Sequence, residues 1–147
     1  MKNIKERQTY YGAINYVTGH LIVKPYSSGN SQNMIQFLKG IKAIHPNQKV
    51  IVIWDGAAYY SSHDFRNYLH QVNEDKPEQE WPIRCIKLAP YVPKQNPIEA
   101  VWSQVKNFLR NMCHLLKTFK ITKWLFELFL SHFVLHSSHV NMYGTFS

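Results

Sequence analysis

The apolar run Val50–Trp54 (VIVIW) constrains the fold more than any other segment of the chain. It holds no polar residue, and a short continuous run of this kind is typical of a parallel strand that is buried on both faces. Asp55 follows directly. Ligands gather outside the carboxyl ends of strands in open α/β sheets, so the run also predicts where a functional carboxylate would lie.

The other patterned segments give the order hairpin, helix, strand, helix, strand, helix, helix. Their expected ranges are Thr9–Val17 and His20–Tyr26 for a hairpin that turns at Thr18-Gly19, 34–44 for a helix, 65–72 for a short helix, 83–88 for a strand, 97–112 for a helix and 121–135 for a last amphipathic helix. An acidic loop from Glu74 to Glu80 is expected to be solvated. This order predicts a single mixed α/β domain with helices packed on a sheet.

Composition sets the broad class of the protein. A chain of 147 residues with 45% apolar residues can bury a core, and the formal net charge of +8 suits a polyanionic partner. Cys85 and Cys113 have no CxxC spacing, so neither a zinc knuckle nor a disulfide framework is expected. With no secretory signal and no run long enough to span a bilayer, the expected location is a reducing, cytoplasmic interior without membrane contact.

Two carboxylates each have a local interpretation and a chemical one. Asp55-Gly56 can form a turn, or Asp55 can cap the next helix. Glu99 falls at the third position of a helix with Asn96 as its N-cap and Pro97 as its first residue, which is where a capping-box glutamate belongs. The helix N-terminus also keeps Glu99 ionised, as a metal ligand must be. Considered singly, each residue favours its local role.

Three segments considered together resemble one protein family. These are IVIWDG, LAPYVPKQNPIEAVWSQVK and the hairpin segment YGAINYVTGHL, and they are similar to the DDE-type transposases of the mariner-like superfamily and its bacterial insertion-sequence relatives. The resemblance runs from about Tyr10 to Leu116. The positions that match the family's proline–asparagine–glutamate segment are Leu88, Pro90, Tyr91, Pro93, Asn96, Pro97, Ile98, Glu99, Trp102 and Lys106.

The resemblance implies a ribonuclease H-like mixed sheet flanked by helices, and two-metal phosphoryl transfer on DNA with Mg²⁺ or Mn²⁺. Asp55 would be the second catalytic acid and Glu99 the third, both as metal ligands. The cap and the metal ligand would then be the same residue. Lys94, Lys106 and Arg110 lie close to these acids in the sequence and are candidates for phosphate contacts, with a simply solvated role as the alternative.

The first acid of the family pattern has no counterpart in this sequence. It should lie on a strand just before the hairpin, but the only acid before Tyr10 is Glu6, which has no apolar strand around it. The expected organisation is therefore a basic segment at 1–9, a partial catalytic domain at 10–116 that lacks the first, central strand, and a helix with a tail at 117–147. Such a fragment would be inactive alone.

The expected partners are DNA and an upstream transposase fragment or a full-length transposase. The alternative function is a non-catalytic nucleic-acid-binding remnant or a regulatory partner, and a ribonuclease H-like nuclease unrelated to transposition is a third. Two further groups of residues have no assigned role. Three histidines, His132, His136 and His139, could share a helical face, a spacing that sometimes binds metal. The apolar residues Trp124, Leu125, Leu128 and Phe129 are expected in the core or at a subunit interface, which is compatible with a homo-oligomer.

Overall fold

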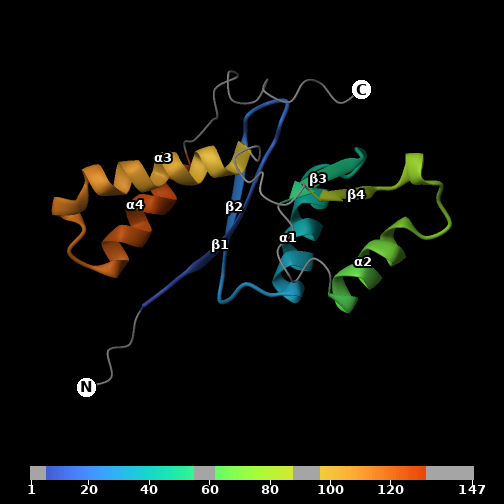
Figure 1. Ribbon diagram of the computed structural model, residues 1–147, viewed down its shortest axis with the longest axis horizontal. Coiled ribbons are helices and arrows are strands. Elements are labelled where there is room, and N and C mark those ends of the chain that lie inside the picture. The colour runs from blue at the N-terminus through green and yellow to red at the C-terminus, as the bar shows by residue number, and fades with distance from the viewer. Residues whose placement is uncertain (1–5, 55–61, 88–96, 132–147) are drawn as a thin grey trace. The chain divides into compact units, whose positions relative to one another are not determined.

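The computed structural model of the chain describes residues 6–54, 62–87 and 97–131. Within these ranges it is a mixed α/β structure with four α-helices and two small sheets, one pairing β1 with β2 and the other pairing β3 with β4 (Figure 1). The chain divides into two compact units. The first unit consists of residues 1–25 and 97–147, and the second of residues 26–96.

The first unit contains the predicted hairpin, with strands β1 (Thr9–Ile14) and β2 (Leu21–Tyr26). Strand β1 ends three residues earlier than expected and β2 begins one residue later, because Asn15 begins the turn. Its side-chain Oδ1 accepts hydrogen bonds from the backbone N–H groups of Val17 and Thr18, at 2.9 and 3.1 Å. Gly19 then closes the turn with a φ of 73°, a left-handed conformation that favours glycine.

Helices α3 (Pro97–Asn111) and α4 (Phe119–Ser131) pack against each other in the same unit, with a short 3₁₀ turn, η4 (Cys113–Leu115), between them. Helix α4 begins two residues before the predicted start because Thr118 Oγ1 accepts a hydrogen bond from the N–H of Ile121 at 3.2 Å. The predicted end of this helix near Leu135 lies outside the described residues.

A side-chain hydrogen bond joins α4 to the hairpin. The hydroxyl of Tyr10 donates to Oε1 of Glu127 at 2.9 Å, and the Tyr10 ring lies 4.5 Å from that of Phe126. Burial raises the pKa of Tyr10, and the hydrogen bond and negative charge of Glu127 raise it further. This hydrogen bond and the ring contact hold the middle of α4 against β1.

The second unit consists of helix α1 (Ser31–Ile44), strand β3 (Val50–Trp54), helix α2 (His63–Asn73), the 3₁₀ turn η2 (Glu78–Glu80) and strand β4 (Ile83–Lys87). Side chains cap the starts of both α-helices. Asn30 Oδ1 accepts from the N–H of Asn33 at 2.8 Å, and Ser62 Oγ accepts from that of Phe65 at 3.3 Å. The apolar residues of α1 from Met34 to Ile41 are buried, whereas Ile44 at its end is 56% exposed.

Strands β3 and β4 run parallel with Val50 opposite Ile83 and Trp54 opposite Lys87. Trp54 and Ile83 lie on the same face of this pair, and the ring of Trp54 meets that of Phe65 on α2 edge to face, with 5.1 Å between ring centres. The parallel direction agrees with the helices that connect the strands.

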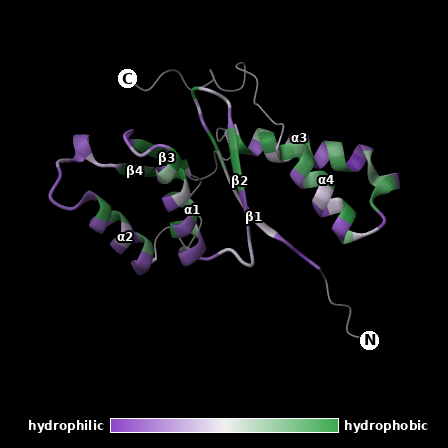
Figure 2. Ribbon diagram, turned by 180° about the vertical axis from the view of Figure 1, so that it is seen from behind, coloured by the Kyte–Doolittle hydropathy of each residue, from purple (hydrophilic) through white to green (hydrophobic). Residues whose placement is uncertain are grey.

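The prediction that β3 is buried on both faces is wrong. Ile51, which points away from the Trp54 face, is 51% exposed, and Ile86 on the neighbouring strand is 36% exposed. Hydrophobic residues along this strand pair are visible in Figure 2. Helix α2 covers one face of the pair, and within the described part of the second unit no element buries Ile51 on the other. The apolar run therefore predicted the strand correctly, but it did not predict which face of the strand is buried.

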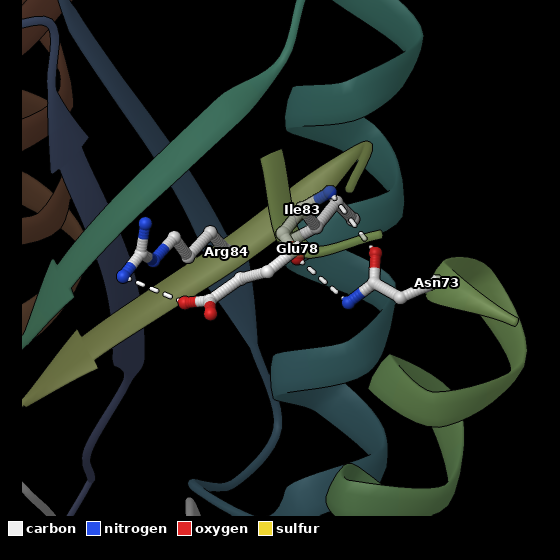
Figure 3. A network of polar contacts seen from close by, with 4 residues as sticks. All are labelled: Asn73, Glu78, Ile83 and Arg84. Atoms are coloured by element: carbon white, nitrogen blue, oxygen red, sulfur yellow. Dashed lines mark hydrogen bonds and ion pairs between the residues drawn. The ribbon is translucent and has the colours of Figure 1, made fainter. Parts of the chain in front are cut away.

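The end of α2 is fixed to the start of β4 by the side-chain amide of Asn73 (Figure 3). Its Nδ2 donates to the carbonyl of Ile83 at 2.9 Å, and its Oδ1 accepts from the N–H of Ile83 at 3.4 Å. Beside it, Arg84 forms an ion pair with Glu78 of the acidic loop at 2.7 Å, where both side chains are about half exposed. The loop is solvated, as expected. None of the helices in the described ranges has the length and apolar character needed to cross a bilayer.

Candidate active site

Glu99 is the predicted site residue that the structure places most clearly. Helix α3 begins at Pro97, as expected, so Glu99 lies in its first turn and is the only acid there. Its side chain is exposed, whereas that of Val101, two residues later, is fully buried. The positive end of the helix dipole lies at this turn and favours a carboxylate. Glu99 is thus an ionisable group on a rigid element that is open to solvent.

Gly12 on β1 fixes how the start of α3 lies on the hairpin. A β-carbon at Gly12 would stand 2.6 Å from Cζ2 of Trp102 and 3.4 Å from Cδ1 of Ile98. Ile98 and Trp102 are one helical turn apart, so both contact the strand at the one residue that has no side chain. Glu99 follows Ile98 directly and points to solvent, so this contact determines where its carboxylate projects.

A small apolar core supports this arrangement. Val101 and Val105 of α3 and Leu130 of α4 are buried together. The side chains that pack around them come from the two hairpin strands, the turn between them, and helices α3 and α4: Ile14, Tyr16, Leu21, Val23, Ile98, Ala100, Trp102, Phe126 and Phe129. The ring of Trp102 also stacks on Phe126, with 6.3 Å between ring centres and 10° between their planes. Trp102 is therefore held from two sides.

The two described basic candidates share a helical face with Glu99. Lys106 lies seven residues after Glu99 and Arg110 eleven, so with 3.6 residues per turn all three lie within one stripe of α3. All three side chains are exposed, and so is Ser103 between them. At 1.5 Å per residue, Lys106 lies about 10 Å along the helix from Glu99. Arg110 is also held by a hydrogen bond from its Nη1 to Oδ1 of Asn107 at 3.1 Å.

Several predicted residues lie outside the described ranges. Asp55, Lys94 and Asn96 are among them, and their roles therefore stay predictions. The same holds for the histidine group at positions 132, 136 and 139. The two cysteines lie within the described ranges, and both are free thiols.

The donor chemistry of Glu99 fits a hard divalent cation, because an ionised carboxylate is the ligand that Mg²⁺ and Mn²⁺ prefer. Over residues 6–54, 62–87 and 97–131, however, no three acidic, histidine or cysteine side chains gather closely enough to hold a metal ion. Glu99 is the one predicted ligand within these ranges. Glu99 therefore fits such a cation by the chemistry of its carboxylate, and the other carboxylates of a metal site would have to come from outside the described residues.

The segments around Gly12 and Trp102 each belong to a motif of the sequence, but neither motif predicts that the two residues touch. The signal was present, since both positions belong to the matching motifs. A glycine in the middle of an apolar strand commonly marks the close approach of another group. Read in that way, Gly12 would have pointed to a large partner, and the tryptophan one turn after the motif's glutamate is the natural candidate.

Comparison with known proteins agrees with this architecture. The model of the DDE superfamily endonuclease family matches residues 2–120, which include strands β1 to β4 and helices α1 to α3. A search of curated proteins gave no match. The family match covers most of the chain and includes the segment that carries Glu99. The chain therefore belongs to the DDE superfamily of endonucleases.

Proposed function

We propose that this chain is the carboxyl-terminal part of the catalytic domain of a mariner-like DDE transposase, with a ribonuclease H-like fold at residues 10–116. The segment at 1–9 would be a basic extension, and 117–147 a helix with a tail. The observation that carries the proposal is the position of Glu99, exposed in the first turn of a helix that the Gly12–Trp102 contact holds in place.

In this proposal Asp55 and Glu99 would hold Mg²⁺ or Mn²⁺ together with a third carboxylate from outside these 147 residues. The bound ions supply charge stabilisation for the attacking and leaving oxygens of a DNA phosphodiester. The two acids position the ions, and Lys106 and Arg110 contact backbone phosphates along the same face of α3. Lys94 would add a further phosphate contact.

The proposal predicts that the chain alone does not cut DNA. Phosphoryl transfer depends on positioning and on charge stabilisation, and two carboxylates are too few to hold both ions. An upstream polypeptide that carries the missing strand and its Asp should restore cleavage. The parallel pair β3–β4 is compatible with such an addition, because in the described residues it consists of two strands only.

The test is a nicking assay on element-end DNA with Mg²⁺ or Mn²⁺, run with the chain alone and with the upstream fragment added. Cleavage should appear only in the mixture and should be lost with Glu99→Gln, while the exposed acid Glu80 provides the matched control Glu80→Gln. Cleavage by the chain alone that needs Glu99 would show that two acids suffice. If the mixture is inactive and the chain still binds DNA, the non-catalytic remnant is the better description.

Two binding measurements test the separate parts of the site. Calorimetry should show weak Mg²⁺ or Mn²⁺ binding that Asp55→Ala and Glu99→Ala each weaken further, and unchanged binding would make Glu99 a cap only. Titration of labelled duplex should show affinity that falls with salt. Removing one phosphate contact with Lys106→Ala or Arg110→Ala should lower the slope of log affinity against log salt by roughly one. Lys24→Ala, an exposed lysine on β2, is the control.

A further inference from the structure

Helix α4 carries a second apolar stripe that stays exposed among residues 6–25 and 97–131, the described part of its unit. One side of the helix packs on α3 through Phe126, Phe129 and Leu130. The opposite side presents Ile121, Trp124 and Leu128, which are 39%, 60% and 42% exposed. These three residues, here called the outer stripe, are spaced three and four apart and so lie on one line. Nearly all of α4 lies beyond residue 120, where the family match ends.

The charges beside the outer stripe distinguish a protein partner from DNA. Lys120 and Glu127 lie along the same edge of the stripe, one turn on either side of Trp124, and both are exposed. These two carry no net charge together, Lys123 lies further round the helix from the stripe, and a carboxylate beside the stripe repels phosphates. A large exposed apolar stripe with a central tryptophan is instead typical of the buried centre of a protein interface.

We infer that the outer stripe binds the same stripe of a second copy of this chain, with the two α4 helices antiparallel around Trp124. In this arrangement a two-fold axis passes between the two copies of Trp124, perpendicular to both helices. It brings the edges that carry Lys120 and Glu127 in the two copies together on the same side of the seam. Lys120 of one copy then lies opposite Glu127 of the other, and Ile121 opposite Leu128. The stripe therefore pairs apolar residues with apolar residues and opposite charges with each other.

The existing contact of Glu127 is compatible with this pairing. Its Oε1 accepts the hydrogen bond from Tyr10, and a carboxylate has a second oxygen that can accept from Lys120 of the second copy. A parallel pairing would instead place the two Lys120–Glu127 edges on opposite sides of the seam, so that Lys120 of one copy could not reach Glu127 of the other. Because α4 is 13 residues long, a seam of one helix per copy buries less than a standard interface, so the dimer should exchange with monomer.

Sedimentation of the full chain over a concentration series tests the pairing. The wild-type chain should shift from monomer to dimer as the concentration rises. Trp124→Ala should weaken dimerisation at least about tenfold, since central tryptophans carry a large part of interface energies. Val17→Ala, at a residue that is 87% exposed in the hairpin turn, should have no effect. A wild-type chain that stays monomeric at every concentration would overturn the inference.

Charge reversal tests the antiparallel direction. Lys120→Glu and Glu127→Lys should each weaken self-association, and an equimolar mixture of the two variants should associate again, because each supplies the charge that the other lacks. Tyr10→Phe removes the same hydrogen bond as Glu127→Lys and should leave association unchanged. Circular dichroism checks that each variant is folded.

Two outcomes of these experiments contradict the proposal. A mixture of folded variants that associates no better than either one alone would exclude the antiparallel pairing. If Trp124→Ala leaves the mass distribution unchanged and lowers the affinity for a single-stranded oligonucleotide, the outer stripe is a base-stacking surface and not a dimer interface.

Discussion

Gly12 and Trp102 are in direct contact across the first unit, with only 2.6 Å between Cζ2 of the tryptophan and the place where a β-carbon on Gly12 would stand. The tryptophan cannot easily move away, because its ring stacks on Phe126 and the helix around it is buried at Val101 and Val105. This contact connects two separate motifs of the sequence. It also sets the direction in which Glu99 projects from the start of α3.

Gly12→Ala should therefore destabilise the chain. The added methyl group overlaps an aromatic ring that is packed on both sides, and overpacking of this kind costs about 1–3 kcal/mol. Gly40→Ala is the matched control, since a β-carbon there meets no atom within 4 Å and Gly40 lies inside helix α1. That change should stabilise the chain by roughly 0.5–1 kcal/mol. Urea unfolding of both variants would show the contrast, and equal effects would contradict the close contact.

The core between α3 and α4 can be tested with one substitution at two sites. Val101→Ala removes two methyl groups from a side chain with no exposed surface, and it should cost about 1–3 kcal/mol of unfolding free energy. Val17→Ala makes the same change at an exposed turn residue and should shift stability by less than about 0.5 kcal/mol. Thermal or urea unfolding measures both. A small effect at Val101 would mean that this core is not packed as described.

Asn73 and Arg84 stand at opposite ends of the polar network in Figure 3 and should differ in their effect on stability. Asn73→Ala leaves both backbone groups of Ile83 without their side-chain partner, and Ile83 is only 1% exposed, so the expected cost is about 1–3 kcal/mol. Arg84→Ala breaks a solvent-exposed ion pair with Glu78, for which about 0–1 kcal/mol is expected. Unfolding curves that rank the two variants the other way would refute this assignment.

Alkaline pH should destabilise the fold in part through Tyr10. Burial, and then the bond to Glu127 and its charge, raise the pKa of Tyr10 above its ordinary value of 10.0. The folded chain therefore keeps the proton at pH values where the unfolded chain loses it. This contribution to the unfolding free energy is constant below pH 10.0 and falls as the pH rises above it. Tyr10→Phe should make the fall shallower in unfolding measured across that range, and an unchanged slope would exclude the contribution.

The two free cysteines should differ in reactivity. Burial raises the pKa of the Cys85 thiol to about 12, so little thiolate forms at neutral pH, whereas Cys113 is exposed after the end of α3. Brief alkylation of the native chain should label Cys113 and leave Cys85 unmodified until denaturant is added. Mass spectrometry of the digested chain identifies the labelled residue. Equal labelling of both thiols would show that β4 opens readily in the native state.

Local elements of this protein follow from neighbouring residues in the sequence. The apolar run Val50–Trp54 is a strand with the predicted bounds, and α3 begins at Pro97 as the Asn-Pro pair indicates. The observed bounds differ from the expected ones where a side chain forms a short-range hydrogen bond with the backbone. Asn15 shortens the hairpin strands, and Thr118 starts α4 early. These shifts are themselves local, because each depends on a side chain within three residues.

Burial and contact were decided by tertiary structure. Ile51 and Trp54 belong to the same apolar run, yet one is half exposed and the other is buried, because burial depends on what packs across each face. Trp124 and Phe129 differ in the same way on α4. The motifs indicated the family and selected Glu99, but the contact that positions it joins β1 to α3 across the length of the chain. Periodicity along a chain specifies which residues share a face, whereas only the folded arrangement determines what covers that face.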